Sequence, residues 1–262
     1  MKKTLSLAVL LCAAVLSSCG DEGVQSIAGP VSGARIKYFN FGVGAPGVYF
    51  FANDTKVTAI GPTLATTSAK GVSTGGTESV TGTIYGGVGA GGFYTTIVPG
   101  AYTLKAKIAA TVDNGLAVAS LATTIADGKF YSYYVSGIYD ATAKTVESFI
   151  VEDAYPANVD YTQAYVRFVN AVSNSSPMTL YAKNTTTLAE VPVGAIVAYK
   201  GGGAFTAIPN GIYNLGARVA GATTNTMSRT AVSFSSGKVY TITARGNITV
   251  TSTQALDNTT NR

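Results

Sequence analysis

The residue types that most often carry out acid–base, nucleophilic or metal chemistry are scarce in this sequence. Its 262 residues include 13 Asp and Glu, 2 Cys and no His. Without His, the chain lacks the commonest general acid or base, the commonest metal ligand, and the base of Ser–His–Asp and Cys–His systems. The composition therefore favours a protein that binds or supports over one that catalyses. We expect no enzymatic activity, no metal site and no cofactor.

Three short strings match catalytic or nucleotide-binding motifs without the structural setting that those motifs need. Residues 71–75 (GVSTG) match the Gly-x-Ser-x-Gly nucleophile elbow, which requires a preceding strand, a following helix and a His base. Residues 42–47 and 87–92 match Gly-x-Gly-x-x-Gly, which binds a dinucleotide only where the turn opens a helix. Because residues 48–51 (VYFF) continue the first glycine string as a β-type run, we interpret both glycine strings as turns.

The charged side chains form no recognisable binding motif. The charged fraction is 12%, about half of the ~25% typical of soluble domains. Lys and Arg are dispersed along the chain, so we expect no nucleic-acid partner. Glu152, Asp153 and Asp160 could supply oxygen ligands to Ca²⁺, but their spacing fits no calcium-binding motif. A solvated linker is the favoured interpretation of these carboxylates.

One aromatic run offers a candidate ligand surface. Tyr131, Tyr133 and Tyr134 lie in a segment of β-type composition, and exposed rings could form a platform on which a glycan stacks. The alternative is that the rings pack inside a β-sandwich, and we favour this packing. A glycan platform is further weakened because the chain has no Trp.

Residues 1–19 have the features of a bacterial lipoprotein signal. A basic start precedes the apolar run 5–16, which is too short to cross a bilayer because a spanning helix needs about 20 residues. Leu16, Ser17, Ser18 and Cys19 resemble the lipobox, in which a signal peptidase recognises small residues before a lipid-modified Cys. We expect cleavage after residue 18 and attachment to a membrane through lipid on Cys19. The alternative is an ordinary secretory peptide with a chance Cys.

The residues behind Cys19 bear on location. The acidic pair Asp21-Glu22 resembles the export signal of some bacterial surface lipoproteins, although acidic residues are also common in any solvated tether. We therefore predict an outer membrane lipoprotein on the periplasmic or the cell-surface face, with the surface preferred.

The body of the chain is an internal repeat. Three blocks of the first half return in the same order in the second half: 34–40 as 164–170, 97–104 as 208–215, and 127–132 as 236–241. The first copy is longer because the Gly- and Thr-rich stretch 61–92 separates its first two blocks, and we expect this stretch to be a long, mobile surface loop.

Within each copy the apolar residues alternate with polar ones. Tyr102, Leu104, Ala106 and Ile108 share one face of a predicted strand, and β-branched and aromatic residues are frequent between turn signals. We predict an all-β fold with two tandem immunoglobulin-like or transthyretin-like antiparallel β-sandwich domains. The predicted parts are a signal peptide (1–18), a lipidated flexible tether (19–33), a first sandwich with an insertion (34–151, with 61–92), a linker (152–163), a second sandwich (164–250) and a flexible tail (251–262).

Three motifs carry a resemblance to a known family. They are RFVNA at 167–171, the Pro-x-Gly-x-Tyr-x-Leu turn and strand at 209–215, and the Gly-Lys-x-Tyr-Thr strand at 237–241. Together they resemble the domain-of-unknown-function family 4397, whose members are often secreted or lipid-anchored bacterial proteins with tandem copies. The resemblance extends over about residues 34–250 and is better in the second copy. It implies architecture and location, and it brings no catalytic residues.

These observations lead to one functional prediction and one alternative. We predict a lipid-anchored, non-enzymatic protein of the cell envelope that acts in adhesion, scaffolding or partner display, with a protein or glycan partner at the surface. The alternative is a glycan- or peptide-binding accessory lipoprotein that uses the 61–92 loop and the strand around Tyr131.

Overall fold

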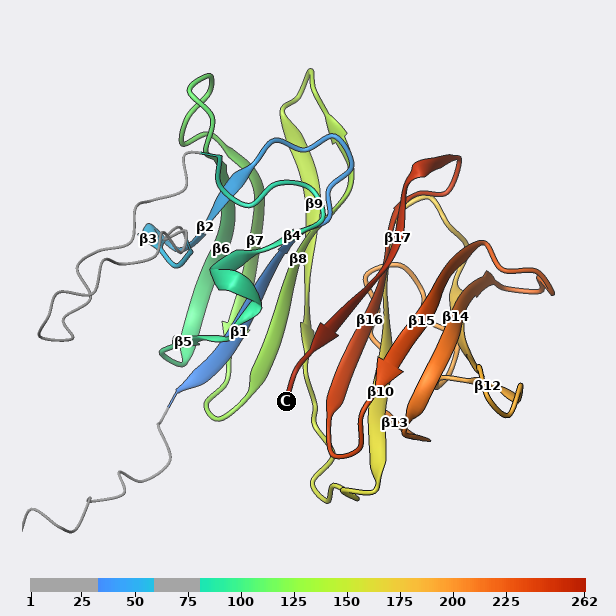
Figure 1. Ribbon diagram of the computed structural model, residues 1–262. Coiled ribbons are helices and arrows are strands. Elements are labelled where there is room, and N and C mark those ends of the chain that lie inside the picture. The colour runs from blue at the N-terminus through green and yellow to red at the C-terminus, as the bar shows by residue number, and fades with distance from the viewer. Residues whose placement is uncertain (1–32, 59–80) are drawn as a thin grey trace, which may run out of the picture. The chain divides into compact units, whose positions relative to one another are not determined.

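A computed structural model describes residues 33–58 and 81–262 (Figure 1). The predicted signal peptide, the lipobox with Cys19 and the tether before residue 33 lie outside the described residues, as do residues 61–80 of the insertion. Residues 33–262 belong to one compact unit. Within the described ranges, no helix is both long enough and apolar enough to cross a membrane.

The first half of this unit consists of two facing sheets. One sheet has the order β4-β1-β8-β9, with β5 also paired to β1, and the other has the order β3-β2-β6-β7. The elements are β1 (Ala34–Asn40), β2 (Val48–Ala52), β3 (Thr55–Lys56), β4 (Gly87–Val88), the 3₁₀ turn η1 (Gly89–Gly92), β5 (Thr95–Ile97), β6 (Gly100–Ile108), β7 (Ala117–Ile125), β8 (Phe130–Asp140) and β9 (Thr145–Glu152).

The second half repeats this plan. Its sheets have the orders β13-β10-β16-β17 and β12-β11-β14-β15, which match the first half with β13 in the place of β5, whereas the first half has β4 in addition. The elements are β10 (Gln163–Ala171), β11 (Met178–Asn184), β12 (Glu190–Pro192), β13 (Thr206–Pro209), β14 (Gly211–Val219), β15 (Met227–Phe234), β16 (Val239–Asn247) and β17 (Val250–Thr260). The all-β class and the two repeated sandwiches predicted from the sequence are therefore confirmed.

The strand pairing is mixed, whereas the sequence analysis predicted antiparallel sandwiches. β1 runs parallel to β8, and β10 runs parallel to β16. A parallel pair cannot be joined by a hairpin and needs a crossover connection. In each copy the first strand and its parallel partner are separated by the strands of the opposite sheet and by short strands that pair antiparallel with the first strand, and this stretch of chain supplies the crossover.

The prediction that residues 251–262 form a flexible tail is wrong. Residues 250–260 form β17, which pairs antiparallel with β16, and the Asn261 amide donates to the Val239 carbonyl at 2.7 Å. Thr is a favourable strand residue, and Leu256 anchors the strand because its side chain is buried in the second core. The second sandwich therefore includes residues 251–260 rather than ending at residue 250.

Part of the insertion is ordered, which corrects the prediction of a mobile loop over 61–92. Gly87 and Val88 form β4, which pairs with the end of β1, and Asn40 holds the preceding segment because its side-chain amide donates to the Thr83 carbonyl at 2.8 Å. The described part, residues 81–92, thus belongs to the first sandwich.

Each sandwich has its own apolar core, and a third apolar cluster joins them. The core of the first sandwich includes Ile36 and Leu104, and that of the second includes Phe168 and Leu215. The third cluster contains Phe39, Phe41, Tyr134 and Phe149 from the first sandwich and Val169 and Ala171 from the second. The sheets that contain β1–β8 and β10–β16 are consequently covered on both faces.

Tyr134 is the central ring of this third cluster. It stacks on Phe39 and on Phe149 with centroid separations of 4.6 and 4.9 Å. Because each such ring pair contributes about 0.5–1.5 kcal/mol beyond its buried area, Tyr134→Leu is expected to lower the free energy of unfolding by about 1–3 kcal/mol. Tyr134→Phe keeps both ring pairs and serves as the control in chemical denaturation. Equal losses in the two variants would contradict a role for ring stacking at the junction.

Candidate functional site

A buried cluster of charged and polar side chains lies where the first sandwich passes into the second. Asp153 follows β9, and its Oδ2 accepts hydrogen bonds from the Tyr94 hydroxyl at 2.6 Å and the Ser132 hydroxyl at 2.9 Å. Its Oδ1 pairs with Nη2 of Arg167 on β10, and the two side chains are 0% and 1% exposed. Burial and the Asp153 carboxylate raise the pKa of Tyr94 well above its usual range, so this hydroxyl remains a donor.

Arg167 connects this carboxylate to the rest of the junction. Its Nε donates to the Thr241 hydroxyl on β16 at 3.0 Å, and its Nη1 donates to the Glu152 carbonyl at 3.0 Å. The guanidinium also lies 4.8 Å from the centroid of the Phe205 ring. A planar guanidinium with several fixed donors can serve all these partners at once, which a lysine could not. Arg167 therefore ties the linker to the central strands of the second sandwich.

Lys37 adds a second cation to the cluster. Its Nζ donates to the Thr260 carbonyl at the end of β17 at 2.9 Å and lies 4.4 Å from the centroid of the Tyr94 ring. Burial lowers the pKa of Lys37 from 10.5 to about 8, because the attraction of Asp153 only partly offsets desolvation and Arg167 adds repulsion. The first strand of the first sandwich is thus bonded to the last strand of the second.

The lowered pKa of Lys37 gives a test of this arrangement. Between pH 8 and 10.5 the unfolded chain binds more protons at Lys37 than the folded chain does, so the free energy of unfolding rises with pH in this window. We expect the wild type to gain up to a few kcal/mol relative to Lys37→Met between about pH 7 and pH 10. Denaturant midpoints of both proteins measured across this range would contradict the assignment if they changed in parallel.

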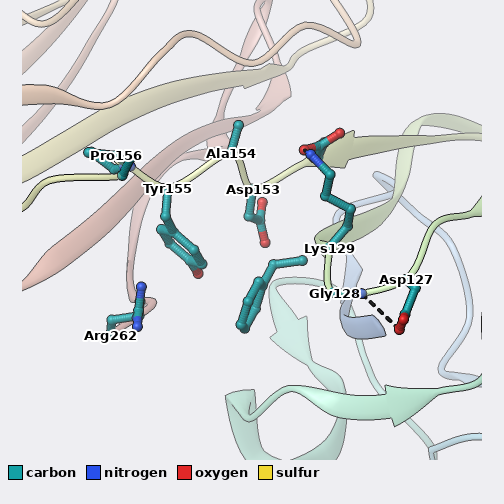
Figure 2. A pocket seen from close by; sticks show the side chains of 11 residues that line it. Asp127, Gly128, Lys129, Asp153, Ala154, Tyr155, Pro156 and Arg262 are labelled. Carbon is teal, nitrogen blue, oxygen red and sulfur yellow. Dashed lines mark hydrogen bonds and ion pairs between the residues drawn. The ribbon is translucent and has the colours of Figure 1, made fainter. Parts of the chain in front are cut away.

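An open pocket of about 470 Å³ adjoins the cluster (Figure 2). Figure 2 shows Tyr155 and Arg262 on one side of the pocket and Lys129 and Asp127 on the other. The Tyr155 hydroxyl lies 2.5 Å from the Tyr94 hydroxyl, which connects the pocket wall to the buried cluster. The full lining is Asp127, Gly128, Lys129, Phe130, Glu152, Asp153, Ala154, Tyr155, Pro156, Ala157 and Arg262.

The pocket walls have mixed charge and are largely engaged with one another. Lys129 pairs with Glu152 at 2.8 Å, and the Arg262 guanidinium lies 5.2 Å from the Tyr155 ring centroid. No nucleophile in the lining is paired with a general base of the kind that acyl transfer needs.

The calcium alternative does not match the positions of its three carboxylates. Asp153 uses both oxygens within the buried cluster, Glu152 pairs with Lys129, and Asp160 Oδ1 accepts from the amide and hydroxyl of Thr162. Over the described ranges, no three His, Cys, Asp or Glu side chains gather as a metal site would require.

The candidate ligand surface at Tyr131, Tyr133 and Tyr134 is wrong, and the packing that the sequence analysis favoured is confirmed. Tyr133 and Tyr134 are 0% exposed and Tyr131 is 8% exposed. β8 is an inner strand of its sheet, and the second sandwich covers the sheet face that would otherwise meet solvent. Tyr133 therefore packs in the first core and Tyr134 in the third cluster, in agreement with the packing alternative weighed from the sequence.

A surface that the sequence analysis did not identify lies on the solvent face of the β3-β2-β6-β7 sheet. Lys56 Nζ lies 4.1 Å from the Tyr49 ring centroid, and Lys107 Nζ lies 4.4 Å from the Phe51 ring centroid. Lys105 is the cross-strand partner of Phe51. A sequence signal for this face was present in residues 104–108 (LKAKI), where Lys alternates with apolar residues that face the core. The pairing of this strand with β2, which brings the rings beside the lysines, could not be deduced from one strand.

These features define a class: an all-β protein of two repeated sandwiches with a closed, charged junction and one lysine-rich sheet face. Residues 164–262 match the family described as Domain of unknown function (DUF4397). The resemblance to that family noted from the sequence is thus shown for the second sandwich, over a range that includes β17.

Other comparisons add little. No curated protein matches the sequence. Among solved structures, the chain is similar to the Bacillus anthracis TIE protein with 16% identity and a TM-score of 0.23, over 81% of this chain and 33% of that one. The chain spans about a third of the length of that protein. We draw no conclusion about fold or function from a similarity at this TM-score.

Proposed function

We propose that this chain is a lipid-anchored, non-enzymatic protein of the cell envelope whose two sandwiches act as one rigid unit for adhesion, scaffolding or partner display. The main support for this proposal is the junction between the sandwiches, which an apolar cluster and a buried ion pair fill. Neighbouring domains move relative to one another by default unless their interface is large and apolar. A junction with its own apolar cluster and a buried ion pair suits a protein that must hold a binding surface in a fixed position.

The features of residues 1–19 support the envelope location. A basic start, a short apolar run and small residues before Cys19 are typical of lipid-anchored proteins. Two or more acyl chains on one residue would hold the protein stably at a membrane. The lack of His supports a non-enzymatic role, because it removes the commonest acid–base catalyst.

Lipid attachment can be tested with a matched pair of cysteine variants. We expect radiolabelled palmitate to label the wild type and Cys12→Ala but not Cys19→Ala, since Cys12 lies within the predicted signal peptide. Labelling of Cys19→Ala equal to that of the wild type would overturn the anchor.

Exposure on the cell can be tested by treating intact cells with a protease and identifying the released peptides. Release of peptides from residues 81–262 before disruption of the outer membrane would support adhesion or display. Release only after disruption would favour a periplasmic scaffold and argue against adhesion.

A further inference from the structure

We propose that the two faces that meet at the junction are a docking pair that also works between chains, so that the second sandwich of one chain binds the first sandwich of another. The first face is the outer face of β1 and β8, and the second face is the outer face of β10 and β16. The proposal goes beyond the proposed function, because it concerns an interaction between two copies of this chain and does not require the lipid anchor.

Corresponding cations of the two copies make corresponding contacts across the junction. Lys37 and Arg167 occupy the same position in the repeat. Lys37 donates to the Thr260 carbonyl of the second sandwich at 2.9 Å, and Arg167 donates to the Glu152 carbonyl of the first at 3.0 Å. Thr260 and Glu152 also correspond, because each is the cross-strand partner of the same repeat position, in β16 and in β8. The junction therefore has approximate two-fold symmetry.

The residues that follow the edge strands β9 and β17 repeat this pattern. The Asp153 amide donates to the Phe130 carbonyl at 2.7 Å, and the Asn261 amide donates to the corresponding Val239 carbonyl, also at 2.7 Å. Each of the two side chains is hydrogen-bonded at 2.9 Å to the hydroxyl at the equivalent position of its own sandwich. Asp153 and Asn261 are therefore equivalent residues. The junction has the form of an isologous interface, in which one patch packs on a copy of itself.

Charge breaks this symmetry and selects which faces pair. Asp153 forms the buried ion pair with Arg167, whereas the residue next to the Thr260 carbonyl that Lys37 contacts is the neutral Asn261. Two second faces would bring each Arg167 against an Asn261 and would leave two buried guanidinium groups without a counter-charge, which is strongly destabilising. The second sandwich is therefore specific for a first sandwich and does not pair with its own kind.

Side-chain size has the same effect. The third apolar cluster takes Phe39 and Phe41 from the first sandwich but Val169 and Ala171 from the corresponding positions of the second. Two first faces would crowd their rings into the same space, whereas two second faces would leave voids. Large side chains meet small ones only where a first face meets a second face, whether in one chain or in two.

The connection between the sandwiches allows such an exchange. Residues 156–159 lie between β9 and β10 and make no backbone hydrogen bond to other residues that the structure describes. A change of backbone direction in this short segment would let each sandwich dock on a sandwich of another chain, which is the route to an exchanged dimer. Such a dimer would contain two junctions, each with the contacts of the monomer.

Two variants that complement one another only between chains test the proposal. Asp153→Asn leaves Arg167 without its counter-charge, and Arg167→Met leaves Asp153 without its own. When the two chains exchange sandwiches, one junction regains the native ion pair and the other joins two neutral residues. Both full chains also carry Cys19→Ala, so that the predicted lipid cannot cause association, and they are refolded together from denaturant.

We expect the mixture to form a heterodimer at a concentration at least about a hundredfold lower than either variant needs to form a dimer alone, because each variant by itself buries an unpaired charge. Light scattering after size-exclusion chromatography detects the dimer, and native mass spectrometry shows whether it contains one chain of each kind. A variant that does not fold alone leaves the test decisive, since folding measured by circular dichroism would then appear only in the mixture.

Asp160→Asn is the matched control for Asp153→Asn, because it removes the charge of an exposed carboxylate in the same linker and leaves the ion pair intact. Its mixture with Arg167→Met should stay monomeric. Equal dimer formation in this control mixture would overturn the proposal. So would a mixture of the first two variants that stays monomeric, or that stays unfolded, at every concentration measured.

One further substitution tests the symmetry on which the proposal rests. Asn261→Asp places a carboxylate beside Lys37 at the position that Asp153 has beside Arg167. The new carboxylate should raise the pKa of Lys37 from about 8 back towards 10.5. The increase in the free energy of unfolding that we expect of the wild type between pH 8 and 10.5 should then disappear. Denaturant midpoints that depend on pH as in the wild type would overturn the equivalence of Asn261 and Asp153.

Discussion

A chain that ends after residue 250 is expected to lose its cooperative thermal unfolding transition. The truncation removes β17, which pairs with β16 from Tyr240 to Asn247, and it removes Leu256 from the second core. It also removes the Thr260 carbonyl that accepts the Lys37 hydrogen bond, which leaves a buried ammonium without that partner. Each backbone hydrogen bond contributes about 1 kcal/mol and a buried Leu about 2–3 kcal/mol, which together approach the 5–15 kcal/mol that typically stabilises a domain.

Circular dichroism and calorimetry of the truncated and full chains would measure this effect. Truncation after residue 261 is the matched control, because it retains β17 and removes only Arg262 at the pocket wall. A truncated chain that melts within a few degrees of the full chain would contradict the assignment of residues 251–262 to the sandwich.

Asp153→Ala is expected to destabilise the protein by about 3–5 kcal/mol, the usual effect of removing one partner of a buried ion pair. The substitution leaves the Arg167 guanidinium buried without a counter-charge and deprives the Tyr94 and Ser132 hydroxyls of their acceptor. For a unit of this size, each kcal/mol changes the melting temperature by about 2–4 °C. The expected decrease is therefore about 6–20 °C, measured by thermal denaturation.

Two comparisons identify the cause of that decrease. Asp160→Ala removes an exposed aspartate and its hydrogen bonds from Thr162, and it should lower stability by about 1 kcal/mol at most. The double variant Asp153→Asn/Arg167→Met removes both members of the ion pair, so that only Lys37 remains charged in the cluster. It should recover part of the loss, because apolar groups can replace a buried pair without large cost. A decrease as large in the double variant as in Asp153→Ala would mean that packing at this position, rather than charge, determines the stability.

The local and repeated features of the fold could be predicted from the sequence. Alternation in residues 102–108 indicated a strand with one buried face, and the structure places Leu104 and Ala106 in the first core. The recurring blocks predicted that the second half repeats the first, as the sheet orders show. The alternation is a local signal, and the repeat is found by comparing the chain with itself. Neither required knowledge of which surfaces of the two sandwiches are in contact.

The features of the junction could not be predicted because they arise from contacts between the two sandwiches. Glu152-Asp153 has the composition of a solvated linker, and only the approach of Arg167 from β10 makes Asp153 a buried partner. The sequence favoured packing of Tyr134, but its place in the third cluster could not be predicted, since its sheet face is covered by residues of the second sandwich. The pairing of residues 251–260 with β16 lies within the second sandwich, and the polar sequence of this segment gave no local sign of it.

The hydrogen bond from Lys37 to Thr260 joins residues 223 positions apart, and this separation has a consequence for biosynthesis. Domains generally fold from the N-terminal end as a chain is made, and the first sandwich has all the strands of its own core by residue 152. Its outer face, with Phe39 and Tyr134, nevertheless stays uncovered until β10 and β16 have been made, and the Thr260 carbonyl that accepts from Lys37 is made later still. A nascent chain therefore passes through a long interval in which one apolar sheet face is open to chaperones and to other chains, and this interval ends only after β17 has been made.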